Sequence, residues 1–380
     1  LIETVPDMKN APALLDQWLK TPAYKNHLET KGNLQHVMLG YSDSMRGHGI
    51  VSAAWEGHKL APTLVNIAKA QGVNIHFFHG RGGTEARGAR ENYASEIGHI
   101  DPVALQAGYT QTEQGEEAYQ KFGNRTRADH NIRDMVATTL ANRHSNADPN
   151  TSRFATQMDE IAGHAEQAYQ DLYQDPALAD HLQQTTPLPH VGLSNAGSRP
   201  ASRIAGLQGP AFLGKLRAIP YVASWYQSAS MAPAYFGLGS GLNQYLNEVP
   251  ALRTQRLGEL REMYNTWPFF QNLVDRADSA IQKADMRIAQ QYADLNPSSQ
   301  HVFDKVQKEY KLSQSMIALL KGNSTSTSEK VADPIRAFAH SSQLELLKAS
   351  KTATPEQRPA IEQGIAMTMQ TIANALGRFG

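Results

Sequence analysis

The fold is decided by His36-Val37-Met38-Leu39-Gly40-Tyr41 and by a second run of the same kind, Val73-Asn74-Ile75-His76-Phe77-Phe78-His79. Each run is short, mostly apolar and followed by polar, glycine-rich residues, which is typical of a buried parallel strand that ends in a loop. Residues 50–71 between them have the pattern of an amphipathic helix, and Gly72 ends that pattern. This order of strand, loop, helix, strand and loop predicts a parallel α/β arrangement.

Outside these two runs the sequence predicts two further strands and many helices. A weaker strand is expected within residues 108–113 and another at 216–221, and residues 1–4 are expected to be a buried strand that leads directly into a helix. The predicted helices are two short ones over 9–29, and longer ones at about 130–145, 152–184, 222–232, 252–292, 298–321 and 334–376.

The strands are too few to close a barrel. Four or five parallel strands leave an open edge with exposed backbone groups. We therefore expect the missing strands to come from a preceding segment or another chain, and the start at Leu1 favours a fragment. The expected organisation is a barrel part at residues 1–230, followed by a helical region at 231–380.

Composition excludes several classes of function. The 380 residues include 36 basic and 36 acidic side chains, so the chain lacks the basic excess of a general nucleic-acid binder. The absence of cysteine excludes disulfides, thiolate metal sites and a cysteine nucleophile. No apolar segment reaches the roughly 18 residues of a membrane span, and we expect a cytoplasmic protein.

The first polar cluster, at residues 40–44, follows the first strand and contains Asp43. Glu3 stands at the end of the N-terminal segment and is a second carboxylate at a predicted strand end. Such oxygen ligands suit Mg²⁺ or Mn²⁺, which commonly bind one or two carboxylates together with water and a substrate phosphate. The alternative is a solvated turn aspartate and a helix-capping glutamate.

The second cluster, at residues 77–88, follows the second strand and contains Arg81 and Arg87 among several glycines. Glycines let backbone N–H groups approach an anion, and arginine makes bidentate contacts with phosphate or carboxylate. Flexible glycines also suit a mobile lid, on which the side chain of Arg87 is expected to be exposed. The alternative is a surface loop with solvated arginines.

The third cluster combines residues 197–201 with residues 215–220, where Arg217 stands inside an apolar run. A buried guanidinium is costly unless it is paired. Arg217 therefore needs a phosphate, a carboxylate ligand or a structural salt bridge, and the sequence leaves these alternatives open. The aromatic segment at 264–270 is expected to pack between helices.

Seven segments, read in order, resemble phosphoenolpyruvate carboxylase of the bacterial and plant type. They are L-I-E-T at 1–4, G-Y-S-D-S at 40–44, F-H-G-R-G-G-T at 78–84, T-E-Q-G-E at 112–116, G-S-R-P-A at 197–201, L-R-A-I-P at 216–220 and W-P-F-F at 267–270. The resemblance implies a mostly helical α/β enzyme built around a TIM-type (β/α)8 barrel with many additional helices. This chain would supply its C-terminal part, and the assembled enzyme would be a homotetramer.

The resemblance also implies a reaction and a set of roles. Phosphoenolpyruvate and bicarbonate would give oxaloacetate and phosphate through carboxyphosphate and an enolate. Glu3 and Asp43 would bind Mg²⁺ or Mn²⁺, and Arg81 and Arg217 would hold the substrate phosphate. Three further residues would belong to the same site: Arg87 on the mobile loop, His79 on its wall, and Arg199 in the third cluster.

Departures from the family pattern keep a second hypothesis open. Arg46 and Gly47 stand where the family has a lysine and an acidic residue, and the lid and the C-terminal tail are altered. Lys283 matches a lysine of the family's allosteric aspartate site, but Ser328 replaces the arginine expected there. The alternative is a diverged, non-catalytic binding or structural module. In either case the isolated chain is expected to be inactive, because the family's catalytic histidine would lie before Leu1, in the missing N-terminal half.

Overall fold

The chain packs into two compact units in the computed structural model, which describes residues 1–89, 92–193, 210–322 and 333–377. Unit 1 contains Leu1–Glu166 and Gly241–Arg276, and unit 2 contains Gln167–Ser240 and Ala277–Gly380. This division by packing is distinct from the expected division at residue 230 into barrel and helical region, which stays a prediction.

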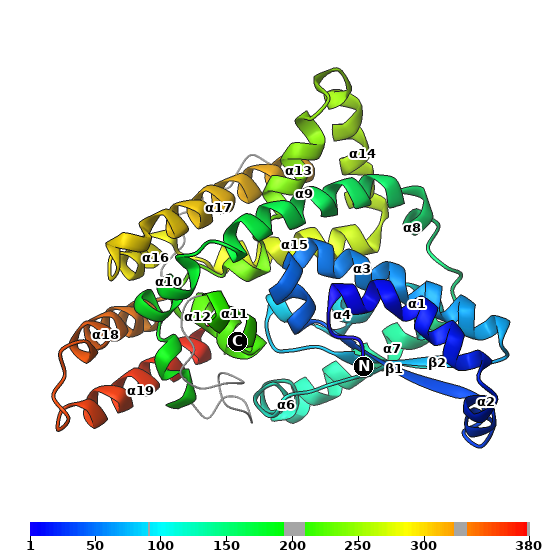
Figure 1. Cartoon of the computed structure of the whole chain (residues 1–380), viewed down its shortest axis with the longest axis horizontal. Coiled ribbons are helices and arrows are strands. Elements are labelled where there is room, and N and C mark those ends of the chain that lie inside the picture. The colour runs from blue at the N-terminus through cyan, green and yellow to red at the C-terminus, as the bar shows by residue number, and fades with distance from the viewer. Residues whose placement is uncertain (90–91, 194–209, 323–332, 378–380) are drawn as a thin grey trace. The chain divides into compact units, whose positions relative to one another are not determined.

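Unit 1 is built around a three-stranded parallel sheet in the order β1 (Leu34–Gly40), β2 (Asn74–Gly80) and β3 (Thr110–Gln111) (Figure 1). Gly40 lies opposite Gly80, and His79 lies opposite Gln111. Ile2 adds a single parallel bridge to Leu39 instead of a full N-terminal strand. The three parallel strands predicted between residues 36 and 113 are therefore confirmed.

The helix between the first two strands is α3 (Ser42–Ala70), and it is broken at Gly49. Gly49 has φ 79° and ψ 165°, a left-handed φ that L side chains rarely adopt. The break leaves a short section with Asp43 and a long section that begins at Ile50, where the sequence predicts the helix to start. Gly72, at φ 72°, follows the end of α3 and reverses the chain into β2.

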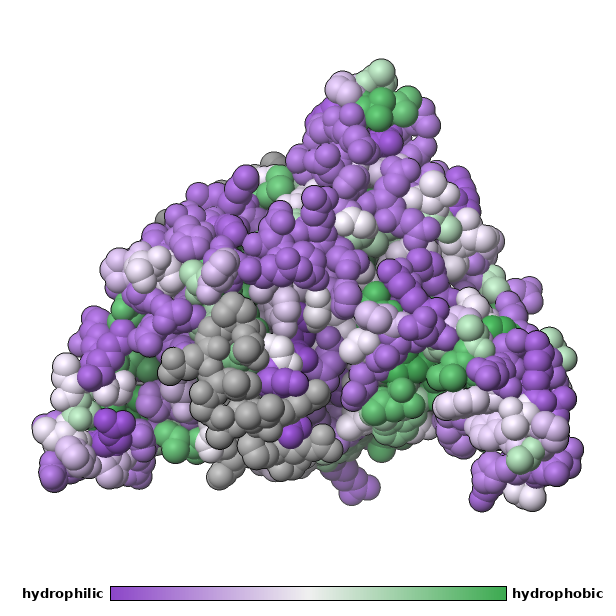
Figure 2. Space-filling model, viewed as in Figure 1, coloured by the Kyte–Doolittle hydropathy of each residue, from purple (hydrophilic) through white to green (hydrophobic). Residues whose placement is uncertain are grey.

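The two faces of the sheet have different surroundings. Val37, Leu39, Ile75, Phe77 and His79 alternate along β1 and β2 on one face and are all buried, and α3 and α5 (Pro102–Leu105) pack against these strands. The intervening residues on the other face are half-buried or exposed. Parallel sheets are normally covered on both faces. Figure 2 shows apolar residues gathered near the N-terminus and β1.

The other named elements of unit 1 are helical. Thr4 begins α1 with a capping box, in which its hydroxyl and the Asp7 carboxylate each bind the other's backbone N–H. The helical elements are α1 (Val5–Lys20), α2 (Pro22–Glu29), η1 (Glu85–Arg87), α4 (Tyr93–Ile97), α6 (Gly115–Phe122), α7 (Arg125–Arg143), α8 (Pro149–Arg153), η4 (Pro250–Leu252) and α14 (Arg253–Thr266), and unit 2 shares α9 (Ala155–Tyr173), α13 (Leu238–Asn247) and α15 (Pro268–Lys283).

The long helices predicted at 152–184, 252–292 and 334–376 are each divided into shorter helices. Trp267 is extended, with φ −115° and ψ 103°, because the residue before a proline disfavours the helical conformation, and Pro268 then begins α15. Trp267 and Phe270 are fully buried, and the Trp267 ring meets Trp55 edge-on at 5.7 Å. The predicted core role of the aromatic segment is confirmed.

In the described residues of unit 2 the named elements are all helices. Its elements are α10 (Leu178–Thr185), η2 (Leu188–Leu193), α11 (Pro210–Lys215), α12 (Ala218–Gln227), η3 (Ala232–Ala234), α16 (Met286–Ala293), η5 (Pro297–Ser299), α17 (Gln300–Lys321), α18 (Pro334–Ser350) and α19 (Arg358–Leu376). Here α18 and α19 pack against each other as a helix pair.

The strand predicted at 216–221 is wrong. Leu216 is a single bridge residue, Arg217 is extended and α12 begins at Ala218. The apolar run around Pro220 was predicted to be a strand. It is the start of a helix, because a proline, which has no N–H, is tolerated in the first turn of a helix. The described residues thus form a mostly helical chain with a small parallel sheet, and the closed barrel stays a prediction. In the described ranges we find no helix with the length and apolarity needed to span a membrane.

Candidate functional site

Four chain segments meet at the carboxyl edge of the sheet. The pairing of Gly40 with Gly80 brings residue 41 and Arg81 to the same edge, and β3 brings Thr112 there through a bond from its N–H to the His79 carbonyl oxygen at 3.0 Å. The bridge at Ile2 adds Glu3. The carboxyl ends of parallel strands are where α/β enzymes place their sites, and the first two predicted clusters lie together there.

Arg81 is a buried cation with unused donors. Its side chain is 3% exposed, its Nη1 donates to the Gly88 carbonyl oxygen at 3.0 Å, and the guanidinium lies 4.9 Å from the centre of the Tyr41 ring. Nε and Nη2 have no hydrogen-bond partner among the described residues. Burial alone would lower the pKa of Arg81. The electrostatic effects of the nearby Tyr41, Tyr109 and Glu96 are larger, so the pKa of Arg81 lies above its usual value. A charged, partly unsatisfied guanidinium is suited to an anion.

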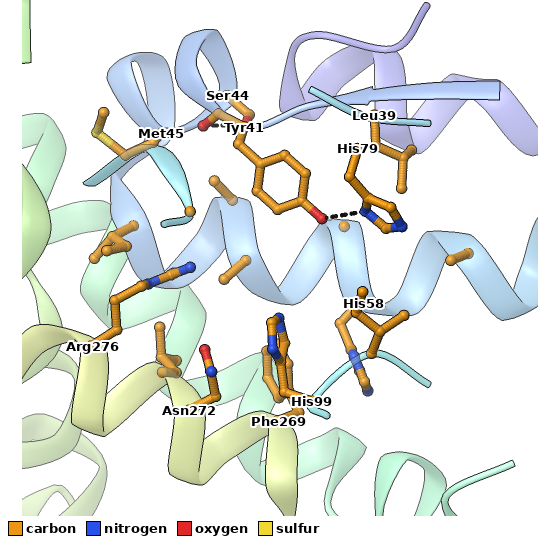
Figure 3. A pocket seen from close by; sticks show the side chains of 18 of the residues that line it. Leu39, Tyr41, Ser44, Met45, His58, His79, His99, Phe269, Asn272 and Arg276 are labelled. Atoms are coloured by element: carbon orange, nitrogen blue, oxygen red, sulfur yellow. Dashed lines mark hydrogen bonds between the residues drawn. The ribbon is translucent and has the colours of Figure 1, made fainter. Parts of the chain in front are cut away.

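His79 is held neutral beside this arginine. Its Nδ1 is 2.8 Å from the Tyr41 hydroxyl (Figure 3). Its ring also stacks on Tyr109, with centroids 5.2 Å apart. Burial, followed by the charges of Arg81 and His76, lowers the pKa of His79 well below the usual histidine value. The buried Nε2 has no partner within the described part of the chain. His79 can therefore donate or accept one further hydrogen bond without carrying charge.

Arg87 corrects the expectation of an exposed side chain on a mobile loop. It is only 4% exposed, and its Nε donates to the Ser42 hydroxyl at 2.9 Å. Its Nη1 donates to Gln114 Oε1 at 3.4 Å. The loop is closed by bonds from the Gly82 N–H to the Arg87 carbonyl oxygen and from the Arg87 N–H to the Thr84 carbonyl oxygen. Other side chains pack so closely against Gly82 and Gly83 that these positions leave no room for a Cβ.

The two carboxylates predicted to bind metal lie on adjacent segments of the edge. A Cβ placed on Gly40 would lie 3.1 Å from the Glu3 Cα, so the glycine lets Glu3 approach the end of β1. Asp43 lies in the first turn of α3, and its Oδ1 makes an ion pair with Arg46 Nη2 at 2.9 Å. The described residues hold no cluster of three or more metal-binding side chains. Two hard oxygen donors are nevertheless a donor set that suits Mg²⁺ or Mn²⁺.

The other predicted site residues belong to unit 2 or lie outside the described ranges. Arg217 is half-buried at the N-cap of α12 in unit 2, and its buried Nε has no partner among the described residues. Lys283 is the last residue of α15 and also belongs to unit 2. Arg199 lies outside the described residues, and so does Ser328.

Sequence reasoning missed a polar cluster next to Arg81. Glu113 Oε1 accepts bonds from the Tyr93 hydroxyl, the Gln111 amide and Lys121 Nζ. Glu96, only 1% exposed, lies 3.6 Å from the same lysine. The T-E-Q-G-E segment after the third strand was the available signal for Glu113. Glu96 and Tyr93 come from a helix with no such signal.

Comparison with known proteins shows the family of the chain. The family model described as phosphoenolpyruvate carboxylase matches residues 1–379. Three relatives named phosphoenolpyruvate carboxylase align with 100% of this chain: that of Mycobacterium leprae (strain TN) is 32% identical over 395 residues and is covered to 41%, and that of Ralstonia nicotianae is 33% identical over 402 residues and is covered to 40%. The relative from Corynebacterium glutamicum (strain ATCC 13032) is 33% identical over 399 residues and is covered to 42%.

The chain thus spans about two fifths of the length of these curated relatives. The similarity extends over the sheet edge, the glycine-rich loop and the helical remainder alike, because the match includes almost every residue. The chain therefore belongs to the phosphoenolpyruvate carboxylase family.

Proposed function

We propose that this chain carries part of the active site of an enzyme that converts phosphoenolpyruvate and bicarbonate into oxaloacetate and phosphate. In that reaction bicarbonate attacks the phosphoryl group, giving carboxyphosphate and the enolate of pyruvate. Carboxyphosphate breaks down to carbon dioxide and phosphate, and the enolate carbon attacks the carbon dioxide. Negative charge develops on oxygen at each stage, so fixed cations and hydrogen-bond donors are what the site must supply.

The observation that carries the proposal is the buried Arg81, whose Nε and Nη2 are without partners among the described residues. Such a group in a purely structural setting would be left unsatisfied at a cost of several kcal/mol. A phosphoryl group would accept from both donors at once. Arg217 is proposed as a second phosphate ligand and Arg199 as a further one, by similarity to the family.

Glu3 and Asp43 are the residues that would hold Mg²⁺ or Mn²⁺. The ion would supply Lewis-acid stabilisation of the enolate and phosphate oxygens when bound. Binding would require Asp43 to exchange its ion pair with Arg46 for the metal. Arg87 is proposed to stabilise carboxyphosphate from the underside of the glycine-rich loop, where Ser42 and Gln114 fix its guanidinium. His79 is proposed to orient the substrate as a neutral hydrogen-bonding group.

The proposed enzyme is larger than this chain. A closed (β/α)8 barrel, a homotetramer and an N-terminal half that supplies a catalytic histidine are all proposals from similarity to the family. The partly exposed face of the sheet supports the barrel, because parallel strands are normally covered on both faces. The chain on its own would bind anions but would not carboxylate. Lys283 is proposed to contribute to an allosteric anion site.

The alternative, a non-catalytic module, is favoured by one observation. Asp43 already has a cationic partner in Arg46, 2.9 Å away, whose charge offsets that of the carboxylate without a metal. Mn²⁺ binding to the 380-residue chain, followed by electron paramagnetic resonance, separates the two readings. The carboxylase proposal expects binding that Asp43→Asn weakens.

The decisive experiment replaces the matching segment of the Corynebacterium glutamicum relative by residues 1–380 and measures oxaloacetate formation. The chimera should form oxaloacetate, and Arg81→Gln should abolish it. Arg125→Gln, at an exposed arginine of α7, is the matched control and should keep it. A folded chimera that is no more active than its Arg81→Gln variant would favour the non-catalytic module.

A further inference from the structure

Tyr41 contacts two side chains of the proposed site. It follows β1 directly and is the N-cap residue of α3, where its carbonyl oxygen accepts a bond from the Ser44 hydroxyl at 3.2 Å. The centre of its ring lies 4.9 Å from Cζ of Arg81. Its hydroxyl lies 2.8 Å from Nδ1 of His79 (Figure 3). Tyr41 thus joins two groups that are proposed to bind the substrate.

The glycine-rich loop packs closely against the Tyr41 ring. Gly88 has φ 93°, and a Cβ placed on it would stand 2.9 Å from Cδ1 of Tyr41. The carbonyl oxygen of the same glycine accepts a bond from Nη1 of Arg81 at 3.0 Å. The Tyr41 ring therefore contacts both Gly88 and the guanidinium that Gly88 binds, so a movement of the ring would disturb both contacts.

The hydrogen bond between Tyr41 and His79 has a preferred direction. Within the described part of the chain, Nδ1 of His79 is the only acceptor for the proton of the Tyr41 hydroxyl. If Nδ1 carried the ring proton, the phenol proton would have no acceptor there, and an unpaired donor next to a buried side chain is costly. If Tyr41 donates to Nδ1, one bond satisfies both groups.

The neutral ring of His79 carries a proton on only one of its nitrogens. Burial is the first cause that lowers the pKa of His79, and the charges of Arg81 and His76 follow. With Nδ1 occupied as an acceptor, the single ring proton is on Nε2. Nε2 is buried and has no partner among the described residues. It is therefore a hydrogen-bond donor that still needs an acceptor.

We infer that Tyr41 is a positioning residue of the proposed active site. Its hydroxyl fixes the tautomer in which Nε2–H of His79 donates to an oxygen of the bound substrate, and its ring holds the guanidinium of Arg81 by a cation–π contact. His79 then recognises an acceptor oxygen and cannot accept a bond from a substrate hydroxyl or ammonium group. The identity of the substrate rests on the proposed function, whereas the tautomer of His79 is a property of the chain itself.

The first test determines the tautomer of His79 in the 380-residue chain, labelled with ¹⁵N in its histidines. Long-range ¹H–¹⁵N correlation spectra distinguish a protonated ring nitrogen from an unprotonated one, and the His79 signals are those that His79→Gln lacks. We expect the proton on Nε2 in the wild type. Tyr41→Phe should shift the Nδ1 signal, because its donor is lost. Tyr264→Phe is the matched control and should leave the signal unchanged, since the hydroxyl of half-buried Tyr264 donates instead to Asp275 Oδ1 at 2.9 Å.

The second test uses the chimera with the Corynebacterium glutamicum relative. A glutamine amide can place an N–H where Nε2 of a histidine lies, whereas an asparagine amide corresponds to Nδ1. His79→Gln should therefore form oxaloacetate at least roughly fivefold faster than His79→Asn. In the isolated chain, Tyr41→Phe should keep the rise in unfolding midpoint that inorganic phosphate causes through Arg81, because the ring remains. Tyr41→Leu, which loses the ring, should weaken that rise.

Protonation of His79 on Nδ1 would overturn the inference, and the wild-type spectrum decides this even if Tyr41→Phe does not fold. Identical His79 signals in the wild type and a folded Tyr41→Phe would overturn it too, as would a His79→Asn chimera that is as active as His79→Gln. A chimera that forms no oxaloacetate in any version would count against the proposed function instead, because the spectra determine the tautomer without it.

Discussion

Gly82 lies directly against the guanidinium of Arg87: a Cβ placed on Gly82 would stand 2.2 Å from Arg87 Cζ and 2.4 Å from its Nε. The next glycine has the same kind of contact, because a Cβ on Gly83 would stand 2.2 Å from Glu117 Oε1. Contacts this short do not occur between real side chains, so both positions must lack a Cβ while the neighbouring side chains stay in place. Gly82 and Gly83 are therefore needed so that the buried side chains of Arg87 and Glu117 can pack against the loop.

Gly82→Ala should destabilise the fold by about 1–3 kcal/mol, because Arg87 must leave its buried position or the loop must shift. The measurement is urea unfolding of the 380-residue chain. Gly163→Ala is the control, since this exposed helical glycine has nothing within 4 Å of its added Cβ. It should gain about 0.5–1 kcal/mol from helix propensity. Equal effects at the two positions would show that the Arg87 contact is absent in solution.

Arg87→Ala should cost about 1–3 kcal/mol of stability, since it removes buried hydrogen bonds to Ser42 and Gln114. The exposed side chain expected from the sequence would instead give an ordinary surface change, within about 0.5 kcal/mol. Thermal unfolding decides between the two values. Arg133→Ala, at an arginine whose side chain is 77% exposed on α7, provides the reference for a surface arginine.

Arg81→Gln should remove phosphate binding from the isolated chain. The wild-type chain should show a midpoint of thermal unfolding that rises with inorganic phosphate, because a ligand bound to the folded state stabilises it. The variant should show no such rise, and sulfate and phosphate should act alike in the wild type, since the guanidinium recognises a tetrahedral oxyanion. A phosphate effect that survives in Arg81→Gln would mean that another group binds the anion.

His58 should make the fold less stable in acid. Burial lowers its pKa to about 3 in the folded chain, from about 6.5 when unfolded, so below pH 6.5 the unfolded state takes up the proton first. Stability is therefore lost as the pH falls from about 6.5 towards 3. Because the His58 side chain is half-buried rather than fully buried, we expect its share to be about 1 kcal/mol between pH 7 and pH 5.

The variant that tests this is His58→Phe, which keeps the stacking on Phe269 at a centroid distance of 4.1 Å. Between pH 7 and pH 5 this variant should lose about 1 kcal/mol less of its free energy of unfolding than the wild type loses. Parallel pH profiles for wild type and His58→Phe would contradict the assignment.

The sequence predicted the sheet because apolar runs with glycine-rich ends report directly on parallel strands. The same rule failed at Arg217, where an apolar run with a proline is the first turn of α12. The glycines around Arg87 led to the prediction of a flexible loop. In the structure they make room for the buried Arg87 side chain. Composition cannot distinguish these two uses, because both need the same residue and only the tertiary contact differs.

The break of α3 at Gly49 divides the helix into two sections that need not share one axis. In an unbroken helix each residue turns the direction of the next by about 100°, so the packing of the long section that begins at Ile50 would also fix the direction of Asp43. The left-handed φ of Gly49 removes this coupling. The orientation of Asp43 can therefore follow the end of β1, independently of how the long section packs against the sheet.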